Sequence, residues 1–173
     1  GATTLSANLT TDGAVNFAGL TANESVTIDS GSQATSTIRA GLITLGQDKS
    51  LTIGTVNTTA AVQFYGATAS TPSAGIVSDL TVNTSGTVTV VNNIGNGTGG
   101  LDEFLIDNAN NIRIGGSITA NRVAITDFSG DDIRFVGGIE GNTGVNNGYA
   151  KFSITDTVSN AYDLAFTGST NKF

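Results

Sequence analysis

Apolar and polar residues alternate over short stretches throughout the chain, most regularly between Phe104 and Gly141. This stretch contains one unit twice: a short alternation, a turn of Asn, Asp, Ser and Gly, a second alternation, and a pair of glycines. Alternation with a period of two residues is typical of a β-strand with one buried face. If the two copies stack, like residues lie above like, so the pattern indicates a solenoid.

Two types of predicted strand follow each other along the chain. In the first type a residue, often Thr or Ser, stands between two apolar residues, and a polar residue or glycine follows. First-type strands begin at residues 26, 51, 80, 104, 123 and 152. The second type has a glycine close behind, and its members are Val15–Gly19, Val62–Gly66, Ile112–Gly115, Ile133–Gly137 and Leu164–Gly168, with Leu42–Gly46 and Val88–Val90 as looser members. Intervals of 19 to 29 residues between first-type strands are typical of a repeat protein with loops of unequal length.

Helix signals are nearly absent, because no segment sustains apolar spacing at a helical period. We therefore expect an all-β chain in which residues 1–173 form a single domain. The expected fold is a parallel β-helix, or β-solenoid, of about six to seven short coils, with Gly115-Gly116 and Gly137-Gly138 as corners of positive φ. Such a rod ends in open sheet edges, so the chain is expected to be a filament subunit or a part of a longer rod.

An antiparallel β-sandwich of the pilin type is the alternative fold. Consecutive predicted strands often lie 8–12 residues apart, which is also typical of a sandwich. In that version the segment from Ala2 to Leu9 would be donated to complete the sheet of a neighbouring subunit.

Composition excludes several classes of function. The net charge of −7 argues against binding to nucleic acid or anionic membranes. The chain has no Cys and no His, so it contains no disulfide, no thiolate or imidazole metal site, and no Ser/His/Asp triad. No run of about 18 apolar residues is present, so we expect no membrane insertion as a helix. We predict no catalytic residues, no enzyme activity and no cofactor apart from a candidate calcium ion.

The candidate calcium site is the acidic segment from Asp127 to Asp132. Oxygen-bearing side chains are placed there as at the start of a calcium loop, and the candidate ligands are Asp127, Ser129, Asp131 and Asp132. The segment lacks the loop's glycine at the sixth position, and Gly138 stands where the loop needs a glutamate. A solvated turn between two strands is the other interpretation.

A carbohydrate-binding or carbohydrate-cleaving β-helix is the rival function. Gly130-Asp131-Asp132 resembles the paired carboxylates of the β-helical polygalacturonases, but the histidine and the Arg-x-Lys element of that family are missing. The candidates for sugar stacking are Tyr65, Tyr149 and Tyr162. The phenylalanines expected to face the interior instead are Phe17, Phe64, Phe135 and Phe166.

The strand pairs resemble β-helical passenger and filamentous-adhesin segments of secreted bacterial surface proteins. The residues that carry this resemblance are Val15–Gly19, Gly115–Ala120, Val123–Thr126 and Leu164–Gly168. The resemblance implies an extracellular structural protein of the cell envelope, a self-assembling surface filament or adhesin rod subunit that serves attachment or biofilm matrix. Its expected partners are copies of itself, joined end to end or by strand donation, and a host or matrix polysaccharide. Glycosylation is permitted at the sequons of Asn8, Asn23, Asn57, Asn83 and Asn96.

Overall fold

The described residues form two parallel β-sheets. The computed structural model describes residues 1–33, 36–66, 68–70, 78–95, 101–116, 118, 120–128, 133–135 and 163–166. These residues contain strands and no helix, and every pair of strands between them is parallel. The prediction of an all-β chain is confirmed. The antiparallel sandwich is wrong for the described part of the chain.

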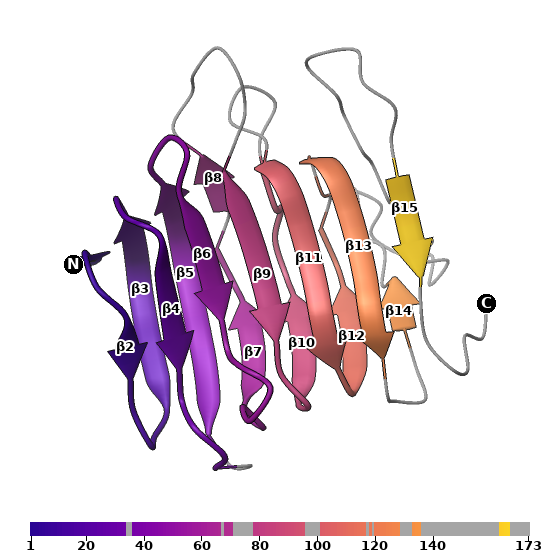
Figure 1. The fold of residues 1–173 in the computed structure, drawn as a ribbon, viewed down its shortest axis with the longest axis horizontal. Helices are drawn as coiled ribbons and strands as arrows, with labels where there is room; N and C mark the ends of the chain where they lie inside the picture. The colour runs from indigo at the N-terminus through magenta and orange to yellow at the C-terminus, as the bar shows by residue number, and fades with distance from the viewer. Residues whose placement is uncertain are drawn as a thin grey trace, which may run out of the picture.

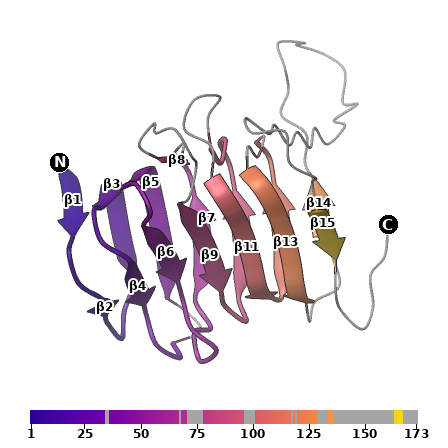
Figure 2. The ribbon, with the colours of Figure 1, turned by 45° about the horizontal axis from the view of Figure 1, so that its top comes forward.

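The strands of the two sheets alternate along most of the chain. Sheet A contains β1 (Ala2–Leu5), β3 (Val15–Ala22), β5 (Thr37–Leu45), β7 (Ala61–Phe64), β10 (Thr87–Val90), β12 (Asn111–Ile114) and β14 (Ile133–Phe135), and β8 (Thr68–Ser70) also pairs with β5. Sheet B contains β2 (Leu9–Thr10), β4 (Val26–Asp29), β6 (Ser50–Ile53), β9 (Asp79–Asn83), β11 (Leu101–Ala109), β13 (Ala120–Phe128) and β15 (Asp163–Phe166). Figure 1 shows sheet B in front of sheet A, with β2 and β3 at one end of the long axis and β14 and β15 at the other. The architecture is therefore solenoid-like, and Figure 2 shows β1 as the outermost strand beside β3.

Equivalent residues stack in columns from one coil to the next. In sheet A one column consists of Val15, Ile38, Val62, Val88, Ile112 and Ile133. In sheet B one column consists of Leu9, Ile28, Ile53, Val82, Ile106, Ile125 and Phe166. From Ile38 to Ile112 in the first column, and from Ile28 to Ile125 in the second, the residues belong to one hydrophobic core between the sheets. Burial of apolar surface contributes about 25 cal/mol per Å², so each added coil stabilises the coil before it.

The two predicted strand types correspond to the two sheets. First-type strands at 26, 51, 80, 104 and 123 fall in β4, β6, β9, β11 and β13 of sheet B. Second-type strands fall in sheet A as β3, β7, β10, β12 and β14. The first-type strand expected at residue 152 lies outside the described residues. Phe17 and Phe64 are buried as expected.

One strand assignment is wrong. Leu164–Gly168 is predicted as a second-type strand, but β15 pairs with β13 and therefore belongs to sheet B. The looser member Leu42–Gly46 does fall in sheet A, because residues 42–45 form the end of β5, although it is residues 38–40 of that strand that align with Val15–Phe17. The error at β15 arises because a short apolar-x-apolar pattern fits either sheet, and a nearby glycine does not decide which.

The glycine corner at Gly115-Gly116 has a different cause from the one expected. The described glycines with positive φ are Gly31, Gly54 and Gly95, so the prediction of positive φ at Gly115 and Gly116 is wrong. A Cβ atom on Gly116 would lie 2.3 Å from the backbone oxygen of Asn92. Glycine is needed there because adjacent coils approach closely. The pair Gly137-Gly138 lies outside the described residues.

Gly54 has a positive φ and also lies where adjacent coils approach closely, so its substitution tests coil stacking directly. Its φ is +87°, and an added Cβ would lie 1.9 Å from the Asn83 backbone oxygen. We expect Gly54→Ala to lower the free energy of unfolding by at least about 2 kcal/mol, measured by urea denaturation. Gly13→Ala is the matched control, because nothing lies within 4 Å of its added Cβ, and its effect should stay within about 0.5 kcal/mol. Equal effects of the two substitutions would contradict the stacking of coils at Gly54.

Candidate functional site

The predicted calcium ligands are only partly described by the structure. Asp127 lies near the end of β13, opposite Asn108 of β11. Ser129, Asp131 and Asp132 lie outside the described residues. Within the described part of the chain, no three acidic side chains come together as a metal site would require. The calcium site at residues 127–132 therefore stays a prediction.

Polar residues that follow the sheet B strands form a ladder of their own. Asn83 Nδ2 donates a hydrogen bond to Asp107 Oδ2 at 2.8 Å, and Thr126 Oγ1 donates to Asp107 Oδ1 at 2.9 Å. The three residues come from the successive strands β9, β11 and β13. In the sequence they are the polar residues that end the first-type strands, so the ladder could have been found from the repeat. The ladder joins three successive coils. Between β9 and β11 it lies at a shift in register, because Asn83 is the backbone partner of Asn108 while its side chain bonds to Asp107.

Asp29 holds a corner between two coils together. Its carboxylate accepts hydrogen bonds from Thr58 Oγ1 at 2.8 Å and Thr55 Oγ1 at 3.3 Å, and from the backbone N–H of Gly31 at 2.9 Å. The bond from Thr58, followed by that from Gly31, lowers the pKa of Asp29 below its usual value, while burial opposes them. Such a carboxylate contributes stability above its unfolded pKa and loses it as the pH falls. The role of Asp29 is structural.

An acidic group on sheet B was missed by the sequence analysis. Asp79, Glu103 and Arg122 occupy one register row across β9, β11 and β13, with Ser50 of β6 before them. Ser50 Oγ donates to Asp79 Oδ2 at 3.2 Å, and Arg122 forms an ion pair with Glu103. The only signal in the sequence was position, since each residue comes just before the first apolar residue of a first-type strand.

The electrostatics of this row favour the protonated carboxyls. Burial, followed by the charge of Asp102, raises the pKa of Asp79 above its usual value, and the hydrogen bond from Ser50 opposes this. Burial also raises the pKa of Glu103, with Arg122 opposing it and the charges of Asp79 and Asp102 adding to it. Both carboxyls therefore lose their proton less readily than free ones, and their charged forms repel each other.

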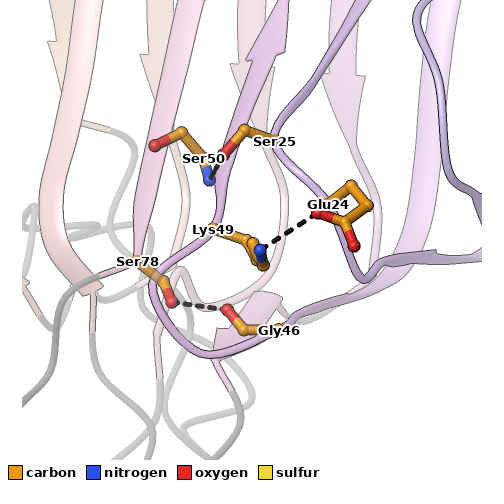
Figure 3. A network of polar contacts seen from close by, with 6 residues as sticks. All are labelled: Glu24, Ser25, Gly46, Lys49, Ser50 and Ser78. Atoms are coloured by element: carbon orange, nitrogen blue, oxygen red, sulfur yellow. Dashed lines mark hydrogen bonds and ion pairs between the residues drawn. The ribbon is translucent and has the colours of Figure 1, made fainter.

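The corner that leads into sheet B is joined by polar contacts between coils. Figure 3 shows this corner with Glu24, Ser25, Gly46, Lys49, Ser50 and Ser78 as sticks. Lys49 Nζ lies 3.0 Å from Glu24 Oε2 as an ion pair, and the backbone N–H of Ser50 donates to Ser25 Oγ at 3.1 Å. Exposed ion pairs contribute at most about 1 kcal/mol, so these contacts set the spacing of the coils more than they stabilise the fold.

Tyr65 does not lie open for sugar stacking. Its ring lies beneath the guanidinium of Arg39, at 5.0 Å from the ring centroid. Its hydroxyl donates to Phe17 O at 2.8 Å and is 3.1 Å from Asn16 Oδ1. The side chain thus spans from the third coil to the first across the outer face of sheet A. The other two candidates, Tyr149 and Tyr162, lie outside the described residues.

The N-terminal end of the molecule presents sheet edges. β1 pairs with β3 only, and β2 pairs with β4 only, among the described strands. The segment Ala2–Leu9, predicted to be donated in the sandwich version, is thus placed on its own sheets. Leu5 and Leu9 are only partly buried against the core. This end therefore offers backbone hydrogen-bonding groups and apolar side chains together.

One of the predicted sequons is unsuited to a glycan. Asn83 is 9% exposed, and its amide nitrogen is bonded to Asp107. Asn8, Asn23 and Asn57 are exposed, and Asn96 lies outside the described residues. Glycosylation at Asn83 would require the coil to open.

Comparison with known proteins gives no identification. No family model, no curated protein and no solved structure matches the chain. Among the described residues there is no helix long and apolar enough to cross a membrane. The resemblance to filamentous adhesins therefore stays a prediction.

Because the pKa of Asp79 is raised, we expect that replacing its carboxyl group with a neutral amide stabilises the fold by an amount that depends on pH. A carboxyl with a raised folded-state pKa lowers stability as the pH rises through that pKa. We expect Asp79→Asn to raise the melting temperature at pH 7 and to have little effect near pH 3, where both states are protonated. Asp12→Asn is the control, because it removes one exposed charge away from the row. Equal shifts for both variants at pH 7 would show that net charge alone is responsible.

Proposed function

We propose that the chain is a structural subunit of an extracellular surface filament or adhesin rod, without enzyme activity. In this proposal the two sheets are the walls of a parallel β-helix of six to seven coils. Copies join end to end by β-strand pairing, so the rod continues from one chain into the next. The observation that supports this most is the N-terminal end, where in-register core columns reach open strand edges.

The end of each column favours continuation. Leu5, Leu9 and Val15 pack against the core but stay partly buried, whereas the equivalent residues one or two coils further in are buried. A strand added beside β1 or β2 would cover this remaining apolar surface. It would also satisfy backbone N–H and C=O groups on the outer edges, which are sticky when left unpaired.

Strand pairing at this end needs no special side chains. Each coil repeats the register of the coil before it, so an edge strand of a second copy meets the same pattern that it meets in its own chain. For example, β15 of a second copy placed beside β2 would continue the Leu9 column with Phe166. This mode of recognition takes its affinity from main-chain hydrogen bonds and its specificity from alternate side chains.

Electron microscopy of the purified chain, with and without calcium, tests the proposal. We expect rods whose length grows with protein concentration and whose strands lie across the rod axis, spaced about 4.8 Å apart. Particles that remain monomeric at every concentration in both conditions would contradict end-to-end assembly.

A charge in the terminal coil should stop assembly. We expect Leu9→Lys to give monomers, because it places an ammonium group in the column that a second copy would cover. The circular dichroism of the strands should be retained, since the variant residue lies in the first coil. Val56→Lys is the matched control, because Val56 is 76% exposed and lies in the loop after β6. Rods formed equally by both variants would contradict a role for the N-terminal end.

A further inference from the structure

Charged residues are segregated between the two sheets. The described strands of sheet A carry three arginines and no acidic residue; these are Arg39, Arg113 and Arg134. The strands of sheet B carry one arginine, Arg122, and seven acidic residues: Asp29, Asp79, Asp102, Glu103, Asp107, Asp127 and Asp163. The two sheets lie one behind the other (Figure 1), with the core between them. Positive charge is therefore concentrated on the strands of one sheet and negative charge on the strands of the other.

The arginines of sheet A share a single register row. Arg39 aligns with Gln63 and Thr89, the row continues to Arg113, and Arg134 is next to it. Arg39 and Arg113 are both exposed. Parallel strands are about 4.8 Å apart, so these two guanidinium groups project from strands roughly 14 Å apart. We call this row the arginine stripe; within it the uncharged Gln63 and Thr89 separate Arg39 from Arg113.

Exposed apolar side chains accompany this stripe. Leu42 of β5 and Val91, just after β10, are each 54% exposed, although they belong to otherwise alternating sheet A segments. A face that combines exposed apolar groups with charge of one sign is typical of an interaction surface.

Negative charges lie close together in the acidic row of sheet B. Asp79 and Glu103 are adjacent in register, the charge of Asp102 adds to the repulsion, and Arg122 forms an ion pair with Glu103. The raised pKa values of Asp79 and Glu103 are a consequence of this arrangement and of burial. Cationic groups brought against the row from outside would relieve the repulsion.

We infer that copies of this chain also associate side by side, with the arginine face of sheet A against the acidic face of sheet B of a second copy. The stripe and the acidic row both follow the stacking direction, and the opposite signs of Arg39 and Arg113 and of Asp79 and Glu103 favour a contact between the two faces. The contact uses two different surfaces of the same molecule, so each copy keeps one face of each kind available. Lateral association is therefore open-ended and builds layers or bundles. It does not depend on the end-to-end pairing proposed above.

Salt dependence separates the two modes of association. Charge complementarity is screened by salt, whereas strand pairing through backbone groups and apolar burial is not weakened by it. We expect side-by-side association, measured by light scattering and sedimentation velocity, to weaken at least about tenfold between roughly 0.05 and 0.5 M salt. Rods seen singly at high salt and in bundles at low salt are the expected result. Salt-sensitive association without any rods would support the lateral contact while contradicting end-to-end assembly.

Substitutions at the two faces identify the contact. We expect Arg39→Gln/Arg113→Gln to reduce lateral affinity at low salt at least about tenfold. Val56→Glu/Asn57→Glu is the matched control, because it lowers the net charge by the same two units in an exposed loop. The control should retain association within about threefold, as expected for charges that lie away from the contact. Equal losses in both variants would mean that net charge alone is responsible and would overturn the proposal.

A complementation experiment completes the test. Arg39→Glu/Arg113→Glu and Asp79→Lys/Asp102→Lys should each fail to associate laterally alone, because one face in each variant has the wrong sign. An equimolar mixture should associate, since the reversed faces then complement each other. The proposal would be overturned by a mixture that does not associate although circular dichroism shows both variants folded, together with wild-type association that does not respond to salt. If the lysine variant fails to fold, lateral association that is salt-sensitive in the wild type and is lost in Arg39→Gln/Arg113→Gln would still support the proposal.

Discussion

Stacking of like residues in a single parallel register is the constraint on which the rest of the structure depends. The buried apolar side chains of paired strands lie over their equivalents in the next coil, so the core contains continuous columns. The Ile38 column of sheet A and the Ile28 column of sheet B face each other and exclude water between them. A shift in register by one residue would move every side chain of a strand to the opposite face of its sheet. Register is therefore fixed wherever a column is apolar.

This constraint determines where polar groups can be placed. Inside the coil corners they must bond to the coil above or below, as the Asp29 and Asp107 carboxylates do. On the outer faces they also fall into rows, because an outward residue stacks as strictly as an inward one. The acidic row of sheet B and the arginine row of sheet A are two results of this rule. Charge patterns on a stacked fold are therefore properties of a whole face.

The alternation of strand types was sufficient to predict the two sheets, because buried Ile, Val, Leu and Phe recur at the same positions of each coil. The Asp107 ladder was implicit in the same repeat, since polar residues follow each first-type strand. β15 was assigned to the wrong sheet because Leu164-Ala165-Phe166 satisfies either pattern. The row of Asp79 and Glu103 was missed because register between strands depends on loop lengths, which vary from coil to coil. The prediction of positive φ at Gly115 and Gly116 was wrong because a close approach between two coils cannot be recognised from the sequence of one coil.

The central claim is that the open N-terminal edges of one chain are covered by the strands of another. High-resolution electron cryomicroscopy of the assembled protein tests this most directly. We expect rods in which sheets A and B continue across each junction, with the outer edges of β1 and β2 paired to a neighbouring copy. Monomers at all concentrations, or assemblies in which β1 and β2 remain exposed to solvent, would contradict it.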